Sequence, residues 1–230
     1  GFGANYGEYE VTLTTEPMRS TSEVCASAGT LHPGAPLAGT TVGGASYFGA
    51  TCGGSEGPDA VYTLDIASAA RLRLRMQSTH DATLHIRTSC MDPVSEVACN
   101  DNFGDATHSL VNMNVTPGRY FVVADGRSDV DAGDFSISAE LAPPQGTPGG
   151  PGDTCGTPLT ITSATTELAA DTFTAADDLS GSCGGAGAPD TVYRLDLPSR
   201  TRVRASFEDA EYPPIAYLRS TCGDTTTELG

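Results

Sequence analysis

Two short segments hold acidic and amide side chains at a spacing that could bind a metal ion. The first reads "NDNFGD" (100–105) and the second "DGRSDVDAGD" (125–134). Ca²⁺ takes about six to eight oxygen ligands, and short loops of Asp, Asn and Gly can fold them around one ion. The same residue types also fill plain β-turns. The sequence predicts that one of these loops binds calcium, and the candidate ligands are Asp101, Asn102, Asp105, Asp125, Asp129, Asp131 and Asp134.

Histidines and nucleophiles give no comparable pattern. His80 and His85 are five residues apart, which places them on opposite faces of a strand, and His32 and His108 lie in expected loops. No set converges as zinc ligands must, so exposed or hydrogen-bonded histidines are expected. The chain has no G-x-S-x-G, no H-E-x-x-H and no phosphate-binding glycine loop. We therefore predict no enzymatic activity, although paired acids for glycoside hydrolysis stay open.

An arginine row alternates with apolar residues in "RLRLRM" (71–76), and Arg202 and Arg204 recur at matching positions. The alternation predicts a strand with Leu72, Leu74 and Met76 inward and the arginines on the outer face. Such a row could bind an anionic polysaccharide or an acidic neighbour. The favoured interpretation is structural: the arginines pair with acids across the strands and cover the sheet with their stems.

The overall charge excludes one class of partner. The net charge is −17, and all twelve basic residues are arginine. An acidic surface repels nucleic acid and anionic membranes and attracts divalent cations, and it also serves solubility. No apolar run has membrane-spanning length. We expect neither nucleic-acid binding nor membrane insertion.

The chain repeats itself. Residues 52–66 read "CGGSEGPDAVYTLDI" and residues 183–197 read "CGGAGAPDTVYRLDL", identical at nine of fifteen positions with an offset of 131. "LHIRTSC" (84–90) likewise matches "AYLRSTC" (216–222). A unit of about 130 residues is right for a self-contained β domain.

The repeat and one linker define the expected domains. "APPQGTPGGPGD" (142–153) holds four Pro and four Gly in twelve residues, which is typical of a linker. One complete repeat is expected over 23–141, and a second, truncated copy over 154–230. "GEYEVTLTTEP" (7–17) resembles "GDFSISAELAP" (133–143). Residues 1–17 are therefore expected to be the tail strand of a preceding repeat.

Seven cysteines without a Cys-x-x-Cys indicate disulfides and an oxidising compartment. Comparison of the two copies favours the pairs Cys25–Cys52, Cys90–Cys99 and Cys155–Cys183, although six cysteines allow fifteen pairings. Cys90 precedes Cys99 by nine residues, and nine residues after Cys222 lies one position beyond Gly230. The partner of Cys222 is thus expected beyond the chain end, with a free or intermolecular thiol as the alternative.

Short alternating segments predict an all-β fold. Gly and Pro contribute 27 and 15 residues, as expected for many strands joined by tight turns. Strands are predicted at 60–66, 71–76, 83–87, 110–115, 119–125 and 134–141, with one or two more between 37 and 47. With about eight strands per repeat, an antiparallel jelly-roll-like β-sandwich fits this pattern.

The combination of "CGG…PDAVYTLDI", "STHDATLHIRTSC", "VACNDNFG", "VTPGRYFVVADG" and "AGDFSIS" resembles the bacterial pre-peptidase C-terminal domain family. The resemblance covers 23–141 and the first half of the next copy. The family is common as tandem copies in large secreted proteins of myxobacteria and relatives. The resemblance implies secretion, a non-catalytic role beside proteases or in surface arrays, and calcium in some members. One departure is that Asp81 aligns with Pro213, so a role that needs this carboxylate cannot belong to both repeats.

These observations predict a secreted or cell-surface bacterial repeat module with a structural or adhesive role, within a longer tandem array or filament. The alternative is an accessory targeting domain of a secreted protease or glycosidase. The expected partners are adjacent repeats of the same protein, an extracellular polysaccharide or a protein ligand. Self-assembly is a further hypothesis, in which strand 7–15 of one copy joins the open sheet of the second repeat in another.

Overall fold

The computed structural model describes residues 7–13, 18–144, 150–161, 168–208, 210 and 212–230. Within these, the first repeat carries one short helix, nine strands and a 3₁₀ turn. Its elements are α1 (Thr21–Ala26), β1 (Gly29–Thr30), β2 (Leu37–Thr40), β3 (Asp59–Ile66), β4 (Ala70–Ser78), β5 (Ala82–Arg87), η1 (Pro93–Ser95), β6 (Glu96–Asn100), β7 (His108–Val115), β8 (Gly118–Gly126) and β9 (Asp134–Ala142).

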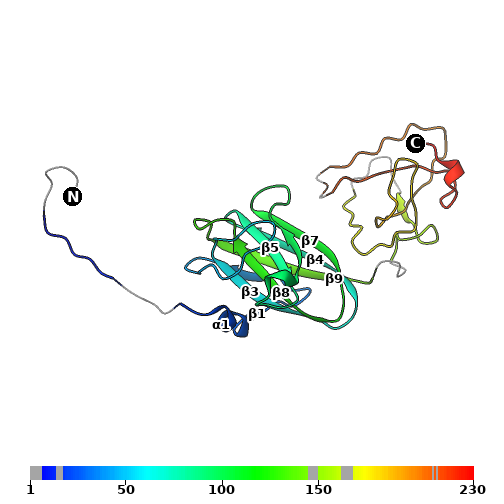
Figure 1. Ribbon diagram of the computed structural model, residues 1–230. Coiled ribbons are helices and arrows are strands. Elements are labelled where there is room, and N and C mark those ends of the chain that lie inside the picture. Colours follow the sequence, from blue (N-terminus) through cyan, green and yellow to red (C-terminus); the bar gives the residue numbers. More distant parts are fainter. Residues whose placement is uncertain (1–6, 14–17, 145–149, 162–167, 209, 211) are drawn as a thin grey trace.

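The strands form the two layers of a β-sandwich (Figure 1). One sheet has the order β1-β3-β8-β5-β6 and the other the order β2-β9-β4-β7. Every pair is antiparallel except the short β1–β3 pair, which is parallel. The predicted all-β sandwich is confirmed.

The core lies between the two sheets and follows the alternation of the strands. Leu72 and Leu74 of β4 are 0% exposed, and Leu64 of β3 faces them from the other sheet in one apolar cluster. The inward direction predicted for Leu72, Leu74 and Met76 is confirmed, because every second residue of a strand points to the same side. This burial is the main source of the stability of the sandwich.

A second, smaller buried layer covers the outer face of the five-stranded sheet. Phe48, from the loop between β2 and β3, and Val24 of α1 pack there against Val61 and Val123. Helix α1 begins at a capping box in which Ser20 and Glu23 satisfy each other's backbone N–H groups. The outer face therefore becomes a site for polar side chains shielded from water.

The disulfides differ from the predicted set. The structure pairs Cys25 with Cys90, Cys52 with Cys99 and Cys155 with Cys222, and it leaves Cys183 as an exposed free thiol. The pairs Cys25–Cys52, Cys90–Cys99 and Cys155–Cys183 are wrong, and Cys222 is bonded within the chain. The reason is β6, a strand absent from our prediction, which places Cys99 beside β5 and away from Cys90.

The second repeat has little regular structure among its described residues. β10 (Leu159–Ile161) pairs in parallel with β11 (Tyr193–Leu195), and η2 (Thr225–Thr227) is a short 3₁₀ helix.

Residues 7–13, expected to be part of a tail strand, are exposed and carry no strand, and they lie apart from the sandwich in Figure 1. Residues 1–6 and 14–17 of that expected segment, and 145–149 of the linker, lie outside the described residues. No helix in the described part of the chain is long and apolar enough to cross a membrane.

Candidate functional site

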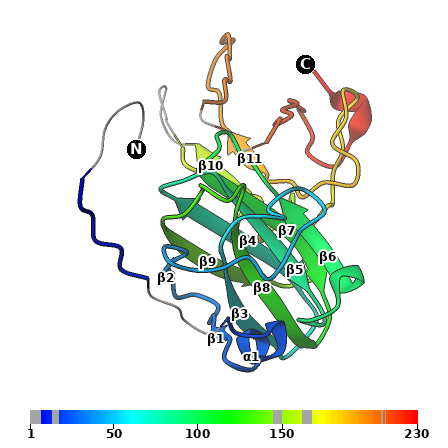
Figure 2. The ribbon, with the colours of Figure 1, turned by 60° about the vertical axis from the view of Figure 1, so that its left-hand side comes forward.

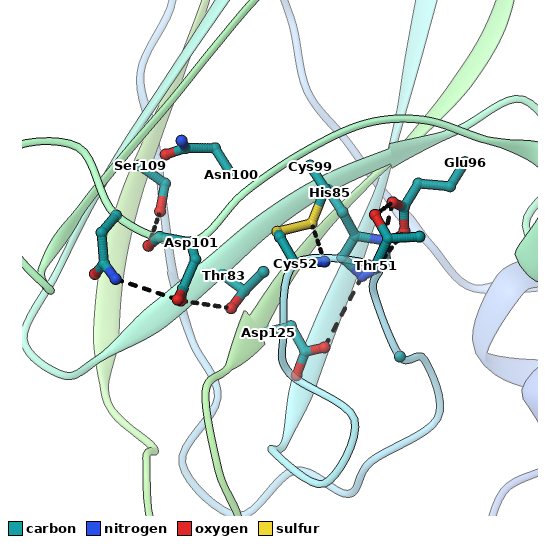
Figure 3. The surroundings of a disulfide bond; sticks show 12 residues. Thr51, Cys52, Thr83, His85, Glu96, Cys99, Asn100, Asp101, Ser109 and Asp125 are labelled. Carbon is teal, nitrogen blue, oxygen red and sulfur yellow. Dashed lines mark hydrogen bonds and ion pairs between the residues drawn. A yellow bond between two sulfur atoms is a disulfide. The ribbon is translucent and has the colours of Figure 1, made fainter.

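Polar side chains from three neighbouring strands meet on the covered outer face of the five-stranded sheet. The register sets Asp59 of β3 opposite Asp125 of β8, and Asp125 in turn opposite Thr83 of β5. His85 follows two residues after Thr83 on the same face, and it lies opposite Cys99 of β6. Figure 3 shows His85 and Asp125 side by side beneath the Cys52–Cys99 disulfide. We call Asp59, His85, Arg87 and Asp125 the polar cluster.

Two carboxyl groups of the polar cluster share a site with little access to water. Asp125 is 0% exposed, and burial followed by the charge of Asp59 raises its pKa to about 9, although Arg87 opposes the shift. Burial also raises the pKa of Asp59 to about 6, against the backbone N–H groups of Tyr47 and Phe48, which donate to it at 2.6 and 2.9 Å. Like charges placed opposite each other repel. Asp125 is therefore protonated at neutral pH, while Asp59 carries the charge.

His85 is the least solvated basic group of the polar cluster. Its ring is 0% exposed, and burial together with the charge of Arg87 lowers its pKa to about 3. Nε2 lies 3.9 Å from an oxygen of Asp125 and Nδ1 lies 3.7 Å from Glu96, but neither nitrogen makes a hydrogen bond. The expectation that each histidine is exposed or hydrogen-bonded is wrong for His85. It is a neutral, buried ring.

Arg87 and Glu96 fasten the covering loops to the sheet. Arg87 donates to the carbonyl oxygens of Gly49 and Cys90 and lies 5.3 Å from the centre of the Phe48 ring. Glu96 accepts the backbone N–H and the hydroxyl of Thr51. Hydrogen bonds to charged groups stabilise more than neutral ones. The two side chains thus hold both disulfide-bearing loops against β5.

The glycines of "CGG" let the chain pass directly over Asp125. Gly54 has φ +75°, and a Cβ atom there would overlap the Asp125 carboxyl group. Gly43 has almost the same φ of +76°, but a Cβ atom there would meet nothing within 4 Å. Alanine substitutions at Gly54 and at Gly43 therefore separate the cost of the backbone conformation from the cost of the overlap with Asp125.

We predict that Gly54→Ala destabilises the first repeat much more than Gly43→Ala. The left-handed backbone alone costs about 1–2 kcal/mol for an L residue, and overpacking adds about 1–3 kcal/mol at position 54. Urea unfolding followed by circular dichroism measures both. Equal losses for the two variants would show that Asp125 yields to the added methyl group.

The second repeat builds the same framework from other residues. Asp190 accepts the backbone N–H groups of Asp178 and Leu179, as Asp59 does for Tyr47 and Phe48. Arg219 donates to Ser180 and Cys222, and Glu228 accepts from Ser182. His85, however, matches Tyr217, whose ring lies 4.6 Å below Arg219. The hydrogen bonds that hold the loops therefore recur in the second repeat, whereas the buried imidazole does not.

The predicted calcium ligands are spread over several environments. Asp105 accepts from Thr107 and from the His108 ring at 2.7 Å, and these bonds, His108 first, lower its pKa to about 2. Asp125 is sealed inside the polar cluster, and Asp129 and Asp134 are exposed.

The remaining candidate ligands lie nearer to one another. Asp101 accepts from Thr83 and from the Asn102 side chain and pairs with Arg127, and Asp131 accepts from Ser128 at 2.5 Å. Burial first, and then the charges of Asp101 and Asp131, raise the pKa of Asp81. Among the residues that the structure describes, no group of three or more His, Cys, Asp or Glu side chains is placed to hold a metal ion. Calcium binding stays a prediction.

The polar cluster lies beneath a loop and lines neither of two hollows in the surface. A surface hollow of about 280 Å³ is lined by residues such as Ala70, Asn114 and Pro144, and another of about 150 Å³ lies at 177–187. Neither lining includes a member of the polar cluster. A general acid or base must reach its substrate within hydrogen-bonding distance, and Asp125 and His85 are covered by the loop over 47–54. Asp59 and Arg87 of the cluster bind the backbone of the covering loops.

Sequence reasoning missed Arg87, Glu96 and Asp59 as framework residues. A signal was present, because Asp59 and Asp190 recur in "PD" and Arg87 and Arg219 recur three residues before a cysteine. Glu96 and Glu228 share the same offset of 132 as those two arginines. Polar residues that recur between copies at strand ends could have been read as contacts to the covering loops.

Comparison with solved structures finds proteins of weak similarity to this chain. The chain is similar to the pre-peptidase C-terminal domain of a collagenase from Bacillus anthracis, with 18% identity and a TM-score of 0.38 over 55% of this chain and 100% of that one. It is also similar to PliG, a periplasmic inhibitor of g-type lysozyme from Aeromonas hydrophila, with 13% identity and a TM-score of 0.30 over 46% of this chain and 85% of that one. No protein-family model and no curated protein matches the chain.

Proposed function

We propose that this chain belongs to a secreted or cell-surface protein in which disulfide-linked β-sandwich repeats have a non-catalytic, structural or adhesive role within a longer tandem array or filament. Three disulfides within 230 residues are typical of proteins outside the reducing cytosol. The sequence resemblance to pre-peptidase C-terminal domains points the same way. Calcium bound at the acidic loops of the first repeat remains part of the proposal.

One observation carries the proposal: the two repeats share fastening contacts and not reactive groups. Asp59 and Arg87 correspond to Asp190 and Arg219 in partner and in role. His85 is replaced by Tyr217 and Asp81 by Pro213. A module that is copied for its mechanical framework needs only the first set. An enzyme copied with its activity would need the second.

Retention on insoluble polymers tests the proposal against its alternative. The full chain is mixed with suspensions of cellulose, chitin, peptidoglycan and fibrillar collagen, and both depletion from solution and release of soluble products are measured. A purely structural module leaves the protein in solution and releases nothing, and an adhesive module is retained on peptidoglycan, the polymer of a bacterial surface. Saturable retention on cellulose, chitin or collagen alone would favour an accessory targeting domain of a secreted protease or glycosidase. Release of soluble products would contradict both functions.

A further inference from the structure

Two of the three arginines in the row on β4 are buried. Arg71 and Arg73 are each 8% exposed, although they lie on the face of the four-stranded sheet that points away from the core. The matching Arg202 and Arg204 of the second repeat are exposed. The second pair lies in a segment without a strand, so the contacts of Arg71 and Arg73 themselves identify what covers the first pair.

The cover comes from the second repeat. The Phe173 ring lies 4.3 Å from the guanidinium carbon of Arg73 and 5.8 Å from that of Arg71, within the range of a cation–π contact. Asp171 pairs with Arg73 at 2.6 Å. Figures 1 and 2 show the second repeat next to the four-stranded sheet. One aromatic ring and one carboxylate of the second repeat thus contact the arginine row.

The sheet is prepared for this contact on its own side. Glu140, opposite Arg73 on β9, accepts from its guanidinium group, and Arg71 donates to the carbonyl oxygen of Pro143. These contacts orient the two guanidinium groups before the second repeat binds. Less side-chain entropy is then lost when the contact forms. Burial opposes the charge of Asp171, but the hydrogen bond from Arg73 and the charges of Arg73 and Arg75 lower its pKa overall.

We propose that the arginine face of β4 is a docking surface for the Asp171–Phe173 segment of the following repeat, and that it fixes the two repeats in one relative orientation. The chemistry of the partner segment is specific: an aromatic ring two residues after an acid. The first repeat has Thr40 and Val42 at the corresponding positions, and Val42 is 64% exposed. The ring and the charge belong to the second copy alone. The Pro- and Gly-rich linker then joins repeats that are held together by side chains.

A single tryptophan tests the docking, because the chain contains none. Phe173→Trp places the reporter in the contact, and Phe207→Trp places it at a side chain that is 57% exposed. We expect acrylamide to quench the reporter at position 173 more slowly than the reporter at position 207, by about two- to fivefold, since tryptophan gives the strongest cation–π contact. Equal quenching of the two reporters would overturn the proposal.

Charge variants in the Phe173→Trp background identify the cause. Asp171→Asn should raise the quenching of the reporter toward that of an exposed ring, and Asp171→Glu, which keeps the charge, should restore protection. Added salt should act like Asp171→Asn, since the screening length falls to about 3 Å at 1 M. The matched control is Arg119→Ala, which removes an exposed ion pair with Asp65 on the other sheet. It should change nothing.

Small-angle scattering on the same full-length variants provides the second measurement. A docked pair of repeats gives one compact distance distribution, and Asp171→Asn should broaden it without altering the circular dichroism of the sandwich. Because Asp171 is exposed, its substitution does not disturb the core. An unchanged distribution together with unchanged quenching in Asp171→Asn would show that the charge plays no part in joining the repeats.

Discussion

Removing the Cys25–Cys90 disulfide should destabilise the first repeat by about 4 kcal/mol on the loop-entropy relation. The bridge spans 65 residues, and it ties helix α1 to the loop after β5 within the covering layer. The double variant Cys25→Ala/Cys90→Ala removes the bridge without leaving a free thiol. Urea unfolding measures the loss.

The Cys52–Cys99 bridge provides the matched comparison. It spans 47 residues and overlaps the first loop, so its removal should cost less while the other bridge is intact. Addition of reductant to the unaltered chain should give the largest loss. A loss well below about 1 kcal/mol for Cys25→Ala/Cys90→Ala would mean that the unfolded chain gains little freedom from this cut.

One unreduced digest distinguishes the pairs in the structure from the pairs inferred from the sequence. Trypsin cuts this lysine-free chain only after arginine, so 20–71 holds Cys25 and Cys52, while 88–119 holds Cys90 and Cys99. The structure predicts that these two peptides stay linked and that 128–194 stays linked to 220–230. The pairs inferred from sequence would release all four peptides separately.

Asp125→Asn should stabilise the protein at neutral pH. The folded-state pKa of Asp125 is raised from 3.8 to about 9, first by burial and then by the charge of Asp59. Between these two values the unfolded chain binds fewer protons than the folded one, so the unaltered protein loses stability as the pH rises. Asparagine has no charge to lose. We expect a gain of about 2–4 kcal/mol at pH 7 from the separation of the two pKa values.

Charged and titratable groups on two neighbouring strands face Asp125. Asp59 faces it from β3, His85 and Arg87 face it from β5, and both oxygens of Asp125 lack hydrogen-bond partners. Since no such bond is lost, the amide should fit. Thermal unfolding of both proteins from about pH 4 to pH 9 should show curves that meet at the acidic end and separate as the pH rises.

An exposed acid gives the opposite sign and serves as the control. The ion pair with Arg119 lowers the pKa of Asp65, so its contribution is present above the unfolded-state pKa and is lost in acid. Asp65→Asn should therefore lose a little stability at neutral pH. A destabilised Asp125→Asn at pH 7 would show that the Asp125 carboxylate is ionised and needed, which would reopen a role in binding.

The strands and the core were accessible from the sequence because they depend on local alternation. Leu72, Leu74 and Met76 are inward for the reason the pattern predicted, since a pleated strand directs every second side chain to one face. β6 was missed because "EVACN" is short and its side chains are mostly half-buried, so its sequence shows no clear alternation of apolar and polar residues. The repeat, visible at an offset of 131, also required no structure.

The disulfide pairing and the polar cluster were decided by the tertiary structure. Which sulfur atoms meet depends on how the loop over 47–54 lies across β5 and β6, and residue spacing carries no information on that path. The arginine row shows the same limit: its alternation fixed the face on which Arg73 lies, but only the packing of Phe173 and Asp171 determined that this face is buried. Alternation with a period of two is a property of one strand. A buried charge or a disulfide, in contrast, requires that two segments far apart in the sequence pack against each other.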